Sequence, residues 1–168
     1  MIAPAEGISL NDKQDATRRL LASGATIHEI NTIRKHLSRA KGGGLARVAY
    51  PATVVSLILS DVIGDDLNVI ASGPAVPDTS TFGDTRRVLE KYDILGQVPP
   101  SVLKRIEQGL DGDIEDTPKA GDAVFERCFS ELVGTNLQAL KAAASMAEQL
   151  GYRTLVLSSS VEGEAKEV

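Results

Sequence analysis

Apolar residues recur along the chain in two patterns, one typical of amphipathic helices and the other of short buried strands. Helical spacing predicts a first helix capped by Ser9, with Asp12 in its first turn, and a second that begins at the capping-box pair Thr26 and Glu29. Further helices are predicted over residues 84–92, 101–108 with Ser101 as its cap, and 137–150. Strands are predicted over residues 53–60, 67–71, 127–133 and 154–157.

This alternation of helices and strands predicts an α/β fold. The run from Thr53 to Leu59 is mostly apolar and rich in β-branched residues, which predicts a strand buried on both faces. Residues 127–157 read as strand, turn, helix and strand, the order of a parallel βαβ unit. We therefore predict a Rossmann-like layered sheet, mostly parallel, with helices on both faces. Residues 1–168 are expected to form a single domain that is truncated at both ends, because neither terminal segment completes an element.

Cations and glycines gather at the end of the second predicted helix. Lys35 and Lys41 lie close to the triple glycine that begins with Gly42 and Gly43. Glycine lets the backbone approach an anion closely and present free N–H groups, so these four residues are predicted to bind carboxylate or phosphate oxygens. The triple glycine fits neither the P-loop nor the dinucleotide fingerprint. A solvated helix face that ends in a flexible turn explains the same residues without any ligand.

Carboxylates follow the apolar strand directly. Ser60 and Asp61 stand at its carboxyl end, with Asp65 and Asp66 close behind, at the edge where open α/β sheets bind ligands. Asp61, Asp65 and Asp66 are candidate magnesium ligands, and Asp61 is equally a candidate base for an attacking hydroxyl. Asn136 begins a helix after a later strand, where an anion or a plain N-cap interaction is expected. A solvated acidic turn explains the three aspartates equally well.

Composition narrows the classes of partner and compartment. A net charge of −5 and a pI near 5.1 argue against nucleic-acid binding, which needs a basic face. A single cysteine, Cys128, excludes an internal disulfide and indicates a reducing compartment. No apolar run reaches the roughly 18 residues that span a bilayer, and no leader follows Met1, so we expect a cytoplasmic protein without a membrane partner. His28 and His36 stand too far apart to share a metal and are expected to be structural or surface groups.

Three stretches of the chain carry a family resemblance: NTIRKHLSRAKGG, LILSDVIGDDLNVIASGPAVPD and TFGDTRRVLEKY. They are similar to the amino-terminal domain of the glycerate 2-kinase family, whose members are often labelled hydroxypyruvate reductases, and the similarity runs from Ala3 to Val168. The resemblance implies a further phosphate-binding segment before Ile2 and a carboxy-terminal domain that this chain lacks. The chain departs from the family pattern at Gly44, where an arginine is expected.

The resemblance implies an enzyme that transfers the γ-phosphoryl group of ATP to the 2-hydroxyl of D-glycerate, with Mg²⁺ as cofactor. Asp61 would act at the metal or the hydroxyl, with Lys35 beside it as a second catalytic residue. Lys41, Gly42, Gly43, Ser60 and Asn136 would contact substrate or phosphate. Two alternatives stay open, an NAD(P)H-dependent hydroxypyruvate reductase and a non-catalytic module for ligand binding or assembly. A homo-oligomer is also possible, because exposed sheet edges favour self-association.

Overall fold

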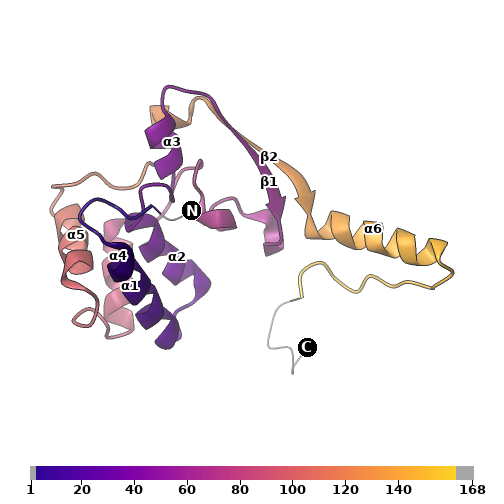
Figure 1. Cartoon of the computed structure of the whole chain (residues 1–168), viewed down its shortest axis with the longest axis horizontal. Coiled ribbons are helices and arrows are strands. Elements are labelled where there is room, and N and C mark those ends of the chain that lie inside the picture. The colour runs from indigo at the N-terminus through magenta and orange to yellow at the C-terminus, as the bar shows by residue number, and fades with distance from the viewer. Residues whose placement is uncertain (1–2, 162–168) are drawn as a thin grey trace. The chain divides into compact units, whose positions relative to one another are not determined.

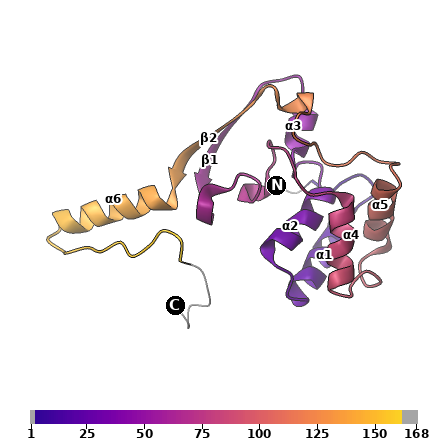
Figure 2. The ribbon, with the colours of Figure 1, turned by 180° about the vertical axis from the view of Figure 1, so that it is seen from behind.

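The computed structural model describes residues 3–161 (Figures 1 and 2). Its helices are α1 (Leu10–Ala22), α2 (Ile27–His36), α3 (Gly44–Ala49), α4 (Phe82–Lys91), α5 (Pro100–Leu110) and α6 (Asn136–Gln149). Its strands are β1 (Val54–Ser60) and β2 (Cys128–Thr135), and its 3-10 turns are η1 (Ile63–Asp65), η2 (Ile70–Ser72) and η3 (Ala123–Phe125). The chain divides into two compact units, unit 1 (Met1–Val54 and Leu67–Phe129) and unit 2 (Val55–Asp66 and Ser130–Val168).

The first two helices begin where their capping residues predict. The Ser9 hydroxyl accepts the backbone N–H of Asp12 at 3.0 Å, and the Asp12 carboxylate accepts that of Ser9 at 3.2 Å. Thr26 and Glu29 form the same reciprocal pair at the start of α2. The prediction was wrong at Ser101, which lies inside α5, because Pro100 occupies the first position of that helix and its ring suits helical φ. The Ser101 hydroxyl instead donates to the Asp12 carboxylate at 2.9 Å and joins α5 to α1.

Unit 1 holds its core between four helices. Helix α1 packs on α2 and α5, and α4 also packs on α2 and α5, so that each helix contacts two neighbours (Figure 1). The buried side chains at the centre are fully apolar: Ala16, Leu20, Ile30, Ile33, Leu37, Phe82, Val88, Leu89, Val102 and Ile106. This packing places the carboxyl end of α2, and its cations, against the loops that follow η2 and α5.

Unit 2 contains most of the two-stranded sheet and helix α6. Strands β1 and β2 run in the same direction, so the sheet is parallel (Figures 1 and 2). The prediction of a strand buried on both faces was wrong for β1. Val55, Leu57 and Leu59 are 63%, 70% and 77% exposed, while the residues between them are partly covered. One face of β1 is therefore sheltered and the other open.

Two predicted strands do not form within the described residues. Residues 67–71 form turns that lead into η2, where Ala71 and Ser72 adopt positive φ angles of 52° and 63° that no strand allows. Residues 154–157 have no regular structure. The predicted α/β class with a parallel sheet is confirmed. The Rossmann-like layering with helices on both faces and the single-domain organisation stay predictions. No helix in residues 3–161 is long and apolar enough to cross a membrane.

Candidate functional site

Unit 1 contains a cavity of about 870 Å³ whose lining is rich in cations. Its charged residues are Lys35, Arg39, Lys41, Arg47 and Arg105 against Glu6 and Glu115. Several segments supply them: the end of α2 and the turn after it, α3, α5 and the loop after α5. A local excess of positive charge in a protein of net charge −5 suits an anionic small molecule.

Lys35 enters this site as half of a buried ion pair. Its Nζ lies 2.9 Å from Oδ1 of Asp78, and the two side chains are 8% and 0% exposed. The same carboxylate accepts the backbone N–H of Ser80 at 3.0 Å, the Ser80 hydroxyl at 2.8 Å and the Thr117 hydroxyl at 2.9 Å. Burial alone would raise the pKa of Asp78, but these hydrogen bonds and the Lys35 charge outweigh it and hold that pKa below its ordinary value. Asp78 is therefore ionised and holds the Lys35 ammonium in place.

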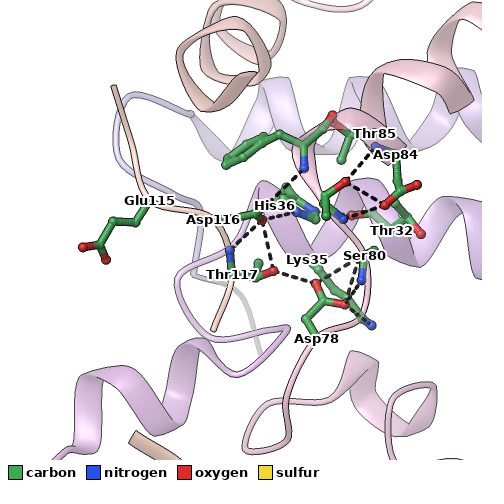
Figure 3. A network of polar contacts seen from close by, with 12 residues as sticks. Thr32, Lys35, His36, Asp78, Ser80, Asp84, Thr85, Glu115, Asp116 and Thr117 are labelled. Carbon is green, nitrogen blue, oxygen red and sulfur yellow. Dashed lines mark hydrogen bonds and ion pairs between the residues drawn. The ribbon is translucent and has the colours of Figure 1, made fainter. Parts of the chain in front are cut away.

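The neighbouring residue, His36, is fixed by a second carboxylate (Figure 3). Its Nδ1 lies 2.8 Å from the Thr32 carbonyl and its Nε2 lies 2.8 Å from Oδ1 of Asp116. Both ring nitrogens therefore face oxygen atoms, one of a carbonyl and one of a carboxylate. The pKa of Asp116, which burial would raise, is lowered by the hydrogen bond and charge of His36 and by the Thr117 N–H. His36 was expected to be a structural or surface group, and its fully buried ring shows that it is not a surface group.

Thr117 joins the two buried pairs into one network. Its hydroxyl lies 2.9 Å from the Asp78 carboxylate and 3.3 Å from the Asp116 carboxylate (Figure 3). Lys119 contacts the same hydroxyl at 2.7 Å and also reaches the Ser80 carbonyl. The network ties the last turn of α2 to two loops that lie 43 and 80 positions further along the chain.

The triple glycine packs against η2 and does not end in a flexible turn. Lys41 donates from Nζ to the Ala71 carbonyl at 2.7 Å and to the Ser72 hydroxyl at 3.2 Å. The N–H groups of Gly42 and Gly43, with φ angles of 55° and 77°, donate to the carbonyls of residues 72 and 73 at 2.9 and 2.7 Å. The expectation that these glycines present free N–H groups was wrong, because the turn at η2 takes both donors. Their predicted role in phosphate binding stays a prediction.

Gly44 begins the short helix α3 at a point where no side chain fits. A Cβ placed on it would lie 2.3 Å from the Arg39 carbonyl oxygen, far inside van der Waals contact. The arginine that the family pattern places here would need a different backbone path. Arg47 lies one turn further along α3 and, like Gly44, lines the cation-rich cavity of unit 1. Its guanidinium donates to the Asp116 carbonyl at 2.6 Å.

A second cavity, of about 540 Å³, lies in unit 2 at the carboxyl ends of β1 and β2. It brings together three residues predicted from sequence, Ser60, Asp61 and Asn136. The N-cap of α6 is Thr135 and not Asn136, because the Thr135 hydroxyl accepts the Gln138 N–H. The Asn136 amide instead donates to the Ser159 carbonyl at 3.0 Å.

Asp65 and Asp66 do not line this cavity. Across residues 3–161 no three His, Cys, Asp or Glu side chains gather as a metal would require. A magnesium ion held by Asp61, Asp65 and Asp66 together therefore has no support in the geometry and stays a prediction. The predicted site also divides between the units, with Lys35, Lys41, Gly42 and Gly43 in unit 1 and the other candidates in unit 2.

Comparisons with known proteins place the chain in a family. A family model described as a domain of unknown function, DUF4147, matches residues 1–107. The chain belongs to this family. This DUF4147 chain is 47% identical over 164 residues to glycerate 2-kinase of Pyrococcus horikoshii, a match that covers 98% of the chain and 36% of the relative. It is 45% identical over 168 residues to a protein of Agrobacterium vitis named putative hydroxypyruvate reductase, which it covers to 36%.

A solved structure extends the likeness to three dimensions. The crystal structure of glycerate kinase from Thermotoga maritima superposes with a TM-score of 0.74 at 45% identity, over 92% of this DUF4147 chain and 34% of that protein. The chain thus spans about a third of the length of the relatives it matches. The resemblance to glycerate kinases stated from the sequence is confirmed.

Sequence reasoning missed the carboxylates that organise the basic cavity. Asp116 ends an acidic segment that shows no sign of a binding role in the sequence, yet it holds the His36 ring. Asp78 gave a weak signal, because it lies in a loop of turn formers and hydroxyls, a composition that suits either a polar ligand or an ordinary connection. No local sequence pattern marks the Lys35–Asp78 or the His36–Asp116 pair, because the two members of each pair lie far apart in the sequence. A third missed residue, the buried Lys13, lines a separate cavity.

Proposed function

We propose that the whole protein transfers the γ-phosphoryl group of ATP to the 2-hydroxyl of D-glycerate and releases 2-phosphoglycerate and ADP. The observation that carries this proposal is the cavity of unit 2, where Asp61 stands at the end of a parallel strand with Ser60 and Asn136 beside it. An acid–base residue at a strand end is the arrangement that α/β enzymes use. The names of the relatives that match almost the whole chain supply the substrate.

In this reaction Asp61 accepts the proton of the substrate 2-hydroxyl as its oxygen attacks the γ-phosphorus, and the bond to the ADP oxygen breaks. Phosphoryl transfer needs positioning and charge neutralisation more than covalent chemistry. The cationic cavity of unit 1 supports that need, with Lys35 and Lys41 as its predicted contacts to carboxylate or phosphate oxygens. Lys35 can use only part of its donor capacity, because one N–H already points to Asp78.

A kinase of this kind ordinarily uses Mg²⁺ to neutralise charge on the nucleotide phosphates. The described residues form no cluster that fits the ion, so no step is assigned to it here. A cytoplasmic location accompanies the proposal and is supported by the single cysteine.

The test replaces Asp61 with asparagine in a polypeptide that carries the chain and any further residues its gene encodes. Turnover should fall by about 10²–10⁴-fold, the usual contribution of a general base, with little change in thermal stability. Phosphorus NMR of a mixture with D-glycerate, ATP and magnesium measures the 2-phosphoglycerate formed. Asp113→Asn, at an exposed position, is the matched control and should leave turnover unchanged. Near-normal turnover of Asp61→Asn would remove Asp61 from the site.

Hydroxypyruvate reduction is the second candidate, favoured by the name of the Agrobacterium vitis relative. It would be detected as loss of NADH absorbance when hydroxypyruvate is added. The absence of a dinucleotide fingerprint from the sequence weighs against it. NADH oxidation without any phosphorylated product would replace the kinase assignment with this one.

A further inference from the structure

Helix α1 carries a lysine that is buried without a hydrogen-bond partner among the described residues. Lys13 is 9% exposed, and its Nζ is covered by protein atoms yet contacts no acceptor there. An ammonium group in this position loses its hydration and gains nothing in return, which is costly unless a ligand supplies the missing acceptors. Such a group indicates either a strained core or a binding site.

The surroundings of Lys13 favour a binding site. Its side chain lines a cavity of about 440 Å³ in unit 1, which is separate from the cation-rich cavity of 870 Å³ and shares Lys41 with it. The lining residues are Leu10, Lys13, Gln14, Thr17, Arg18, Leu21, Arg34 and Lys41. Four of these eight described residues are cations and none is a carboxylate. A wall of this composition repels cations and attracts anions.

The positive charge in this cavity is largely uncompensated. Arg18 pairs with Asp15 at 3.1 Å, so its charge is neutralised by a carboxylate that does not line the cavity. Arg34 contacts only a neutral acceptor in the described structure, the Asn31 amide oxygen at 3.3 Å. Lys41 likewise donates to a carbonyl and a hydroxyl. Three cations therefore face one another with no carboxylate partner among residues 3–161.

Burial and the repulsion between these cations both act on the pKa values of Lys13 and Lys41. Burial, together with the charges of Lys41 and Arg34, lowers the pKa of Lys13 to about 8. Burial and the charge of Arg34 also lower the pKa of Lys41. A bound anion would reverse both shifts, because it stabilises the protonated amines.

We propose that Lys13, Arg34 and Lys41 form a binding site for the phosphate group of a small organic anion. A phosphate monoester carries close to two negative charges and several acceptor oxygens, which matches three cations better than a single carboxylate does. The guanidinium of Arg34 can present two parallel N–H groups to it, and the Lys13 ammonium has all three donors free for it. Leu10 and Leu21 supply apolar wall for the organic part of the ligand. The site stands on its own contacts and does not rest on the proposed kinase reaction.

Inorganic phosphate is the first probe, with acetate as the carboxylate probe. Binding is measured by calorimetry, and the pKa of Lys13 by NMR of its side-chain nitrogen. Saturating phosphate should raise the pKa of Lys13 from about 8 by one unit or more. Lys13→Met, which keeps most of the length of the side chain and removes its charge, should weaken phosphate binding at least about 10-fold. Lys104→Met on the exposed face of α5 is the matched control and should bind as the unaltered chain does.

A second variant, Arg34→Gln, guards against failure of the first to fold and should weaken phosphate at least about 10-fold. Circular dichroism checks that each variant is folded. Unchanged phosphate affinity in a folded Lys13→Met or Arg34→Gln variant overturns the proposal. So does a Lys13 pKa that phosphate leaves unmoved. Tighter binding of acetate than of phosphate overturns the assignment to a phosphate group.

Discussion

The two units treat their apolar and charged residues in opposite ways. In unit 1, four helices enclose an apolar core, and the buried charges Lys35 and Asp78 neutralise each other at 2.9 Å. In unit 2, strand β1 turns Val55, Leu57 and Leu59 outward with more than half of each side chain exposed. The helices of unit 1 and strand β1 both carry strong apolar patterns in the sequence. The pattern determines which element forms, whereas burial depends on what packs against it.

Partners remote in sequence account for this difference. Asp78 lies 43 positions after Lys35, and Asp116 lies 80 positions after His36, yet each pair meets within 3 Å. Once such a pair is buried, either member alone would be an unpaired charge or donor in a low-dielectric interior, so the two are energetically coupled.

The largest expected effect comes from removing Asp78. Asp78→Ala leaves the Lys35 ammonium buried without its carboxylate and deprives Ser80 and Thr117 of their acceptor. The free energy of unfolding should fall by about 3–5 kcal/mol, the cost of breaking a buried pair. Denaturant unfolding followed by circular dichroism measures it. Asp15→Ala, which breaks the more exposed pairs with Arg18 and Arg19, is the control and should cost about 1 kcal/mol or less.

Restoration of stability by a second change would sharpen this result. Lys35→Met combined with Asp78→Ala removes both charges and should recover part of the loss, because no buried charge is then left unpaired. A loss below about 1 kcal/mol for Asp78→Ala alone would contradict the view that unit 1 depends on this pair.

Local signals in the sequence were enough for five of the helices and for the strand that precedes Asp61, whereas α3 was not predicted. Capping residues determine where helices begin over a few positions, and the structure begins α1 and α2 after Ser9 and Thr26. The candidates Ser60, Asp61 and Asn136 came together for a similar reason, because each stands next to a strand end or helix start that the sequence marks. These features depend on interactions within one or two turns of the chain.

Elements that depend on remote contacts could not be predicted. Residues 67–71 have the composition of a strand, but Lys41 holds the Ala71 carbonyl and Gly42 holds the carbonyl of Ser72, which together stabilise a turn with positive φ. The free N–H groups expected at Gly42 and Gly43 are used in the same contacts. Tertiary hydrogen bonds here outweigh local propensity, and no pattern within residues 67–71 announces them.

A pair of leucines tests the contrast in burial directly. Leu89 in α4 is fully buried and Leu57 in β1 is 70% exposed. Leu89→Ala should lower the free energy of unfolding by about 2–5 kcal/mol, because it removes packed atoms and leaves a cavity. Leu57→Ala should change it by no more than about 0.5 kcal/mol, as at other surface positions. Equal losses for the two variants would mean that the open face of β1 is covered in solution.

The smallest expected effect is a change in how the free energy of unfolding depends on pH below about 4, caused by removing the charge of Asp116. Burial alone would raise the pKa of Asp116. The hydrogen bond from His36 outweighs burial and holds this pKa below its ordinary value of 3.8. A carboxyl whose pKa is lower in the folded state stabilises the fold above its unfolded pKa and loses that contribution as the pH falls through the folded value. Asp116→Asn should therefore cost about 1–2 kcal/mol near pH 6, since its charge-assisted hydrogen bonds are partly open to solvent. The difference from the unaltered chain should shrink as the pH falls from about 4 toward 2.

Denaturant unfolding of both proteins at a series of pH values measures this difference. Subtraction removes the contribution of carboxyls outside the Thr117 network that also have lowered pKa values, such as Asp84, because they contribute equally to both curves. Asp113→Asn, at an exposed position, should leave the acid limb unchanged. A difference that stays constant from pH 6 to pH 2 would mean that Asp116 supports the loop through shape and neutral hydrogen bonds. The contrast between the units would then rest on Lys35 and Asp78 alone, because the charge on Asp116 would add nothing to the stability of unit 1.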